Sequence, residues 1–249
     1  MYFRLLLFLA SLFVSLSGGF AKTILIVVTN HDRMGDTGTP TGYFLAEVAH
    51  PWEVFTEAGY TVEFASPAGG FAPMDPKSFD LSDPINKKFW HDLEAVQGVV
   101  STQALGELDP NDYAAIFFAG GHGTMWDFPE AESVRDAISQ HYSSGGVVGA
   151  VCHGPAALVG VEIDGVPLVR GKTVAGFTNE EEEAVQLTEA MPFLLETKLR
   201  ELGAEYVEAD NFEPKVAVSG RLVTGQNPAS ATGAAEAIVK LLRGKSSGF

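Results

Sequence analysis

The sequence predicts a single α/β domain with a mostly parallel central sheet. Three apolar runs, residues 23–30, 114–118 and 147–151, show no polar alternation, which is typical of strands covered on both faces. Amphipathic patterns over residues 43–58 and 130–143 predict helices between them. With 46% hydrophobic residues, the 249-residue chain can bury one large core.

The chain opens with a predicted βαβ unit. The strand at 23–30 is followed by the helix at 43–58 and a second strand at 61–66, which implies a parallel pair joined by a right-handed crossover. The loop at 31–42 is rich in Gly and Thr and lies at the carboxyl end of the first strand. Open α/β sheets build their sites at that end, so we expect this loop to border a site.

Residues 67–94 interrupt this alternation with many Pro and Gly residues and several aromatic side chains, which favours an insertion or lid. After the strand at 147–151, Asp164-Gly165 and Ser219-Gly220 each lie between short apolar runs and predict hairpins. Helices are expected near residues 191–202 and 229–242. No internal repeat or second core is visible, so residues 22–249 are predicted to form one domain.

Residues 1–21 differ in composition from the rest of the chain. Arg4 precedes an almost uninterrupted apolar stretch, 5–16, and small residues follow up to Ala21. This pattern predicts a secretory signal peptide cleaved after Ala21, and therefore an exported protein, periplasmic or secreted. The stretch is shorter than the roughly 20 residues of a membrane span, so we expect no membrane association after cleavage, with an uncleaved anchor as the alternative.

The composition narrows the range of partners. A formal net charge of −16 argues against binding of nucleic acid or anionic membranes, which need clustered Lys and Arg, and favours small or neutral substrates. One cysteine permits neither an internal disulfide nor a Cys-rich zinc site, and His31, His50 and His91 show no metal-ligand spacing. No complete Gly-x-x-x-x-Gly-Lys-Ser/Thr phosphate loop is present. We therefore expect neither a metal nor a cofactor.

Cys152 is the candidate nucleophile. It lies between the strand at 147–151 and a small-residue segment that can begin a helix. A residue on such a turn projects above the sheet edge, and the free N–H groups of a helix start favour a thiolate. An inert buried cysteine is the alternative.

Three further positions can support a reactive thiol. His153 either hydrogen-bonds the Cys152 sulfur or only caps the following helix. Glu47, on the helix at 43–58, either reaches the same sheet edge or is a solvated surface group. In the segment 120–124, Gly-Gly-His-Gly-Thr, the glycines let backbone N–H groups approach a ligand, and His122 either contacts substrate or makes a structural hydrogen bond.

Four segments taken together carry a family resemblance: EVAHP at 47–51, GGHGT at 120–124, AVCHGPA at 150–156 and TGQNPAS at 224–230. In this order they resemble the DJ-1/ThiJ/PfpI superfamily, and in particular its Hsp31-like branch, which includes glutathione-independent glyoxalases. The resemblance spans nearly all of residues 23–243. It implies a three-layer sandwich of the flavodoxin-like or class I glutamine amidotransferase-like type, with a nucleophile elbow.

The resemblance also implies roles for single residues. Cys152 matches the nucleophile and His153 its adjacent histidine, while Glu47 matches the glutamate whose carboxyl hydrogen-bonds the sulfur and exchanges protons with substrate. The third acid of the triad follows the Gly-Phe-Thr segment, and its spacing places it on Glu182. Because residues 180–183 are all glutamate, this assignment is open by one or two positions, and the other three are expected to be solvated.

The oxyanion-stabilising groups implied by the resemblance are Gly121 and the backbone N–H of His153, beside Gly120. The implied activity is that of a cofactor-independent glyoxalase III-type lyase, a D-lactate dehydratase, which converts methylglyoxal to D-lactate through a Cys152 hemithioacetal. The resemblance further implies a homodimer. A stress chaperone or holdase using apolar surface near residues 71–90, or a deglycase or peptidase using the same cysteine, are the alternatives. Export is a departure from the better-known relatives, which are intracellular.

Overall fold

A seven-stranded sheet forms the centre of the computed structural model, which describes residues 22–246. The strand order is β10-β11-β5-β4-β1-β2-β3, and every neighbouring pair is parallel except the β10–β11 hairpin. The predicted mostly parallel α/β fold is therefore confirmed. The strands are β1 (Thr23–Val27), β2 (Thr61–Ser66), β3 (Gln103–Ala104), β4 (Ala115–Phe118), β5 (Val147–Val151), β10 (Val216–Ser219) and β11 (Leu222–Gly225).

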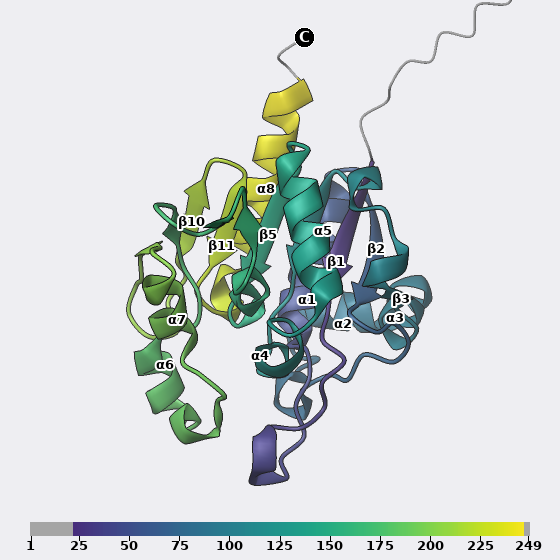
Figure 1. The fold of residues 1–249 in the computed structure, drawn as a ribbon. Coiled ribbons are helices and arrows are strands. Elements are labelled where there is room, and N and C mark those ends of the chain that lie inside the picture. Colours follow the sequence, from purple (N-terminus) through teal and green to yellow (C-terminus); the bar gives the residue numbers. More distant parts are fainter. Residues whose placement is uncertain (1–21, 247–249) are drawn as a thin grey trace, which may run out of the picture.

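Helices cover both faces of the sheet and make a three-layer sandwich (Figure 1). On one face α1 packs against α8 and α2, and their apolar side chains meet Ile26 and Phe117 of the sheet. On the other face α5 and α7 contribute Ile138 and Leu199 to a second core with Phe118. The α-helices are α1 (Leu45–Glu57), α2 (Pro84–His91), α3 (Leu93–Val100), α4 (Thr124–Asp127), α5 (Glu132–Ser143), α6 (Asn179–Ala184), α7 (Leu195–Glu201) and α8 (Ala231–Ser246).

Short elements complete the chain. The hairpin predicted at Asp164-Gly165 is β6 (Glu162–Ile163) with β7 (Val166–Pro167), and both turn residues have positive φ. A separate parallel pair joins β8 (Thr173–Val174) to β9 (Glu205–Tyr206). The 3-10 helices are η1 (Gly35–Thr37), η2 (Pro76–Ser78), η3 (Leu105–Glu107), η4 (Pro110–Asp112), η5 (Gly154–Leu158), η6 (Thr188–Ala190) and η7 (Pro228–Ser230).

The segment at 67–94 is more regular than its composition suggested, since it contains η2 and α2 and leads into α3. Both α-helices begin at an aspartate: Asp83 accepts hydrogen bonds from two backbone N–H groups of α2, and Asp92 accepts one from α3. The start of α2, an aspartate followed by proline, was readable in the sequence. The many Pro and Gly residues of this segment instead favoured an irregular insertion.

The predicted signal peptide, residues 1–21, lies outside the described residues. Within residues 22–246, no helix combines the length and the apolar character needed to cross a bilayer.

The sheet register brings the loops of the site together. Val27, Phe118 and Ala150 are paired across β1, β4 and β5, so the chain leaves all three strands at one edge. Gly120 and Cys152 each follow two residues after their paired positions. The two loops they belong to are therefore adjacent, as the carboxyl ends of parallel strands must be.

Substitution of Phe117 tests how much the packing of α1 on the sheet contributes to stability. Its fully buried ring contacts Phe55 of α1 edge-to-face at a centroid distance of 6.0 Å. We expect Phe117→Ala to lower the free energy of unfolding by about 3–5 kcal/mol, because it removes buried surface and leaves a cavity. The matched control is Phe71→Ala, whose ring is 68% exposed. Urea unfolding of both variants measures the difference, and equal losses would contradict the packing described.

Candidate active site

Cys152 lies on a strained turn at the end of β5. Its φ of 59° is in the left-handed region, which non-glycine residues rarely adopt and which costs on the order of 1–3 kcal/mol. Two backbone hydrogen bonds hold it there: its N–H donates to Gly225 O at 2.9 Å, and its carbonyl accepts from Phe177 N at 2.9 Å. The predicted strand–turn–helix is present, with the 3-10 helix η5 after the turn.

His153 lies against the Cys152 sulfur. Its Nδ1 is 3.4 Å from Sγ, and its Nε2 is 2.8 Å from Oε2 of Glu182. The side chain makes no capping hydrogen bond to η5, so of the two alternatives for His153 the structure supports contact with the thiol. Because an ionised carboxylate only accepts hydrogen bonds, the network assigns the ring proton to Nε2 and leaves a lone pair on Nδ1 facing the sulfur.

Glu182 is the member of the glutamate run that meets His153. It lies in the first turn of α6 and is buried, as is Glu181. The expectation that three of the four glutamates are solvated is wrong, since only Glu180 and Glu183 are exposed. Glu181 instead forms a capping box with Thr178 and accepts hydrogen bonds from Phe212 N and Asn227 Nδ2. Glu181 therefore has a structural role. Because residues 180–183 are all glutamate, the sequence does not show which of them has it.

Glu47 is fully buried in the first turn of α1, so the surface-group alternative is wrong. Its Oε2 accepts a hydrogen bond of 2.8 Å from Gly120 N, and its Oε1 is buried without a hydrogen-bond partner. Burial raises the pKa of Glu47 to about 8, against the lowering effects of Cys152 and of the Gly120 N–H. The carboxyl therefore keeps its proton at neutral pH and can donate it to the sulfur.

The thiol and the imidazole are both neutral at rest. Burial raises the pKa of Cys152, charge on Glu47 acts in the same direction, and only the His153 backbone N–H opposes them. The expectation that the helix start favours a thiolate is thus outweighed by burial. Burial, together with neighbouring His122, also lowers the pKa of His153 despite the pull of Glu182. A neutral imidazole beside a thiol is arranged to take the proton as the sulfur attacks.

The glycine loop after β4 fits against the cysteine turn. A Cβ on Gly120 would lie 2.7 Å from both Glu47 Oε2 and His153 N, and Gly121 has a φ of 104°, so both positions favour glycine. Within residues 22–246, the N–H groups of Gly121 and His153 donate to no backbone carbonyl. The His153 N–H instead acts on the Cys152 sulfur, whose pKa it lowers.

Thr124 connects the two loops and was missed by the sequence reasoning. Its hydroxyl lies 2.9 Å from Gly121 O and 3.0 Å from His153 O, within hydrogen-bonding distance of both carbonyls. A hydroxyl shared in this way fixes the peptide groups of Gly121 and His153 relative to each other. In the sequence, only the position of Thr124 within the GGHGT segment pointed to a role in the site.

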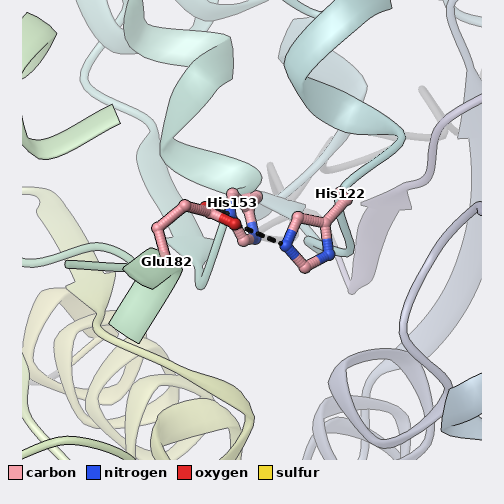
Figure 2. A group of neighbouring side chains, drawn as sticks. All are labelled: His122, His153 and Glu182. Atoms are coloured by element: carbon pink, nitrogen blue, oxygen red, sulfur yellow. Dashed lines mark hydrogen bonds and ion pairs between the residues drawn. The ribbon is translucent and has the colours of Figure 1, made fainter. Parts of the chain in front are cut away.

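His122 extends the network on the far side of Glu182. Its Nε2 is 3.0 Å from Glu182 Oε1, so one carboxylate accepts a hydrogen bond from each of two imidazoles (Figure 2). The His122 and His153 rings are 4.1 Å apart at their centroids. Burial alone would raise the pKa of Glu182, but the two histidines lower it to about 2. Of the two alternatives for His122, the structure shows the structural hydrogen bond.

The same three residues are also the group of His, Cys, Asp and Glu side chains in the described chain whose arrangement suits a metal ion. The histidines His31, His50 and His91 do not join such a group within residues 22–246.

Comparison with known proteins identifies the family. A sequence model of the DJ-1/PfpI family matches residues 40–241. The chain belongs to the DJ-1/PfpI family. It is 33% identical to Glyoxalase 3 of Candida albicans over 231 residues, which cover 88% of this chain and 97% of that protein. It is also 33% identical to the glutathione-independent glyoxalase HSP31 of Saccharomyces cerevisiae, covering 84% of this chain and 93% of the relative.

Solved structures of similar proteins share the fold. The Rapid Encystment Protein of 24 kDa from Francisella tularensis superposes with a TM-score of 0.86 at 40% identity, covering 89% of this chain and 99% of that one. Glyoxalase III of Candida albicans superposes with a TM-score of 0.83 at 32% identity, covering 89% and 98%. The family resemblance and the flavodoxin-like α/β fold expected from the sequence are thus confirmed.

The raised pKa of Glu47 predicts a pH dependence of stability. The folded state binds this proton more tightly than the unfolded chain, whose glutamate has a pKa of 4.5. The resulting stabilisation is complete below about pH 4.5 and is lost as the pH rises through about 8, on the order of a few kcal/mol. Glu47→Gln, which stays neutral, removes this loss.

Urea unfolding at pH 5 and pH 8 measures this loss of stability in the wild type and in Glu47→Gln. Glu180→Gln, which changes an exposed glutamate, is the control and keeps the wild-type pH dependence. If Glu47→Gln showed the same change in the free energy of unfolding between pH 5 and pH 8 as the wild type, the Glu47 carboxyl would ionise normally.

Proposed function

We propose that this DJ-1/PfpI protein is a glutathione-independent glyoxalase, which converts methylglyoxal or a related 2-oxoaldehyde to D-lactate or the corresponding hydroxy acid. The observation that carries the proposal is the placement of one sulfur between two proton carriers: His153 Nδ1 at 3.4 Å and the protonated Glu47 carboxyl. The names of the relatives at 33% identity support the same activity.

The first step is attack by Cys152. His153 Nδ1 accepts the thiol proton as Sγ bonds to the aldehyde carbon, and the oxygen of that carbon becomes an oxyanion. The N–H groups of Gly121 and His153 stabilise it, as in an oxyanion hole. The imidazolium returns the proton to this oxygen, which gives a neutral hemithioacetal and a neutral His153.

The second step moves hydrogen between the two carbons. His153 removes the hydrogen of the thiol-bearing carbon as a proton while Glu47 protonates the neighbouring ketone oxygen, which forms an enediol. The imidazolium then protonates the second carbon as Glu47 takes back a proton from the first oxygen. A side chain with a pKa of about 8 can give and take a proton near neutral pH. The product is a thioester on Cys152.

Hydrolysis completes the cycle. His153 deprotonates a water that attacks the thioester carbonyl, and the protonated imidazole then returns a proton to the departing sulfur. Glu182 stays ionised throughout, since its pKa is about 2, and it stabilises the imidazolium in every step. The scheme consumes one water and requires no oxidant, glutathione or metal.

The decisive assay incubates purified protein with methylglyoxal alone and measures D-lactate. We expect one D-lactate for each methylglyoxal consumed by the wild type, and none above background for Cys152→Ala. Absence of D-lactate from a folded wild-type protein would overturn the proposal. In that case a deglycase or peptidase activity of the same cysteine becomes the leading hypothesis.

Glu182 has a matched control two positions earlier. We expect Glu182→Gln to lower kcat/KM by about 10²–10⁴-fold, because the amide cannot stabilise the His153 imidazolium and leaves its ring without a carboxylate. Glu180→Gln, on the exposed face of α6, keeps wild-type kcat/KM. Steady-state kinetics on both variants measure the difference, and equal rates would remove Glu182 from the triad.

A chaperone activity is a second candidate, favoured by exposed apolar side chains. Phe71 and Leu93 lie in and beside the segment at 67–94 and are largely solvent-exposed. Suppression of client aggregation that persists in Cys152→Ala and is lost in Phe71→Ser would support it. Export through residues 1–21 and assembly as a homodimer stay predictions.

A further inference from the structure

Three metal-binding side chains converge beside the cysteine. One donor atom from each of His122, His153 and Glu182 lies within 4.8 Å of the other two. They come from three separate segments, the glycine loop, the cysteine turn and α6, and point at a common centre (Figure 2). In the proposed glyoxalase cycle His122 exchanges no proton with the substrate and acts only through its hydrogen bond to Glu182.

We propose that this cluster is an inhibitory site for a transition-metal dication such as Zn²⁺. Two imidazole nitrogens and one carboxylate form a donor set that zinc readily accepts, with a fourth position left for water. Mg²⁺ and Ca²⁺ prefer oxygen ligands and are poorly matched to it. The site is distinct from Cys152, whose sulfur faces the other nitrogen of His153.

The surroundings favour such an ion. The two oxygens of the Glu182 carboxylate already lie 2.8 and 3.0 Å from the Nε2 atoms of His153 and His122. Zn–N and Zn–O bonds of roughly 2.0–2.2 Å require the donors to move closer together. His122 can make this movement because its side chain is 15% exposed, whereas His153 is fully buried and packs on Phe177 at 4.4 Å. The net charge of −16 attracts cations.

Metal binding would remove the catalytic base. In the metal-free network each Nε2 donates its proton to Glu182, which leaves the His153 Nδ1 lone pair facing Sγ at 3.4 Å. A metal on Nε2 requires the ring proton to move to Nδ1, since the coordinating nitrogen must be deprotonated. Nδ1 then carries a hydrogen and cannot accept the Cys152 proton. The same ion occupies the triad carboxylate, so the cysteine is left without its base.

Binding is tested directly, on metal-stripped protein without a polyhistidine tag. We expect Zn²⁺ titrated by calorimetry to bind at one site per chain, and Co²⁺ to give a visible absorption spectrum without a thiolate charge-transfer band. Cys152→Ala keeps the affinity, because its sulfur is not a ligand. His122→Asn weakens binding at least tenfold, whereas His91→Asn, which changes an exposed histidine, leaves binding unchanged.

Any of three results would overturn the site: no stoichiometric Zn²⁺ binding by the wild type, equal affinity in His122→Asn, or loss of binding in Cys152→Ala. The inhibitory effect rests on the proposed glyoxalase activity and is measured separately. D-lactate formation should fall in proportion to Zn²⁺ occupancy and recover fully on addition of EDTA. Full activity with the site saturated would refute inhibition, and a protein inactive without metal would refute the proposed function while the binding result still decides the site.

Discussion

The left-handed backbone of Cys152 is the constraint on which the site depends. At a φ of 59° the cysteine turns out of the sheet at the end of β5, and the next residue begins η5. A turn of this kind persists only where the surrounding structure holds it. Here β11 holds the Cys152 N–H through Gly225, and the segment leading to α6 holds its carbonyl through Phe177. The second of these tethers belongs to the segment that brings Glu182 to His153.

Two buried carboxyl groups of opposite ionisation flank the cysteine and its histidine. Glu47 is fully buried and accepts one backbone hydrogen bond, so burial dominates and it keeps its proton. Glu182 is also buried, but two imidazoles surround it and hold it ionised. The same side-chain type thus supplies a proton on one side of the sulfur and a fixed negative charge on the other. Environment, not residue identity, assigns the acid and the counter-ion.

The loop after β4 and the turn after β5 are in close backbone contact. Gly120 brings its N–H to Glu47 and lies against the N–H of His153, where any side chain would collide. Thr124 then connects the carbonyls of Gly121 and His153 through one hydroxyl. Because the two loops follow paired residues of neighbouring strands, the sheet register fixes their separation before any side chain is considered. The relative position of the Gly121 and His153 peptide groups is therefore set by the fold itself.

Much of this protein was determined by the sequence alone. Uninterrupted apolar runs identified the buried parallel strands, and the lone cysteine after one of them identified the turn at Cys152. Both signals depend on residues that are neighbours in the sequence. The burial of Glu47, the separate duties of Glu181 and Glu182, and the contact of His122 with Glu182 depend on segments far apart in the chain. Only tertiary packing decides them, since identical glutamates become a cap, a counter-ion or a solvated group according to which neighbours the fold places beside them.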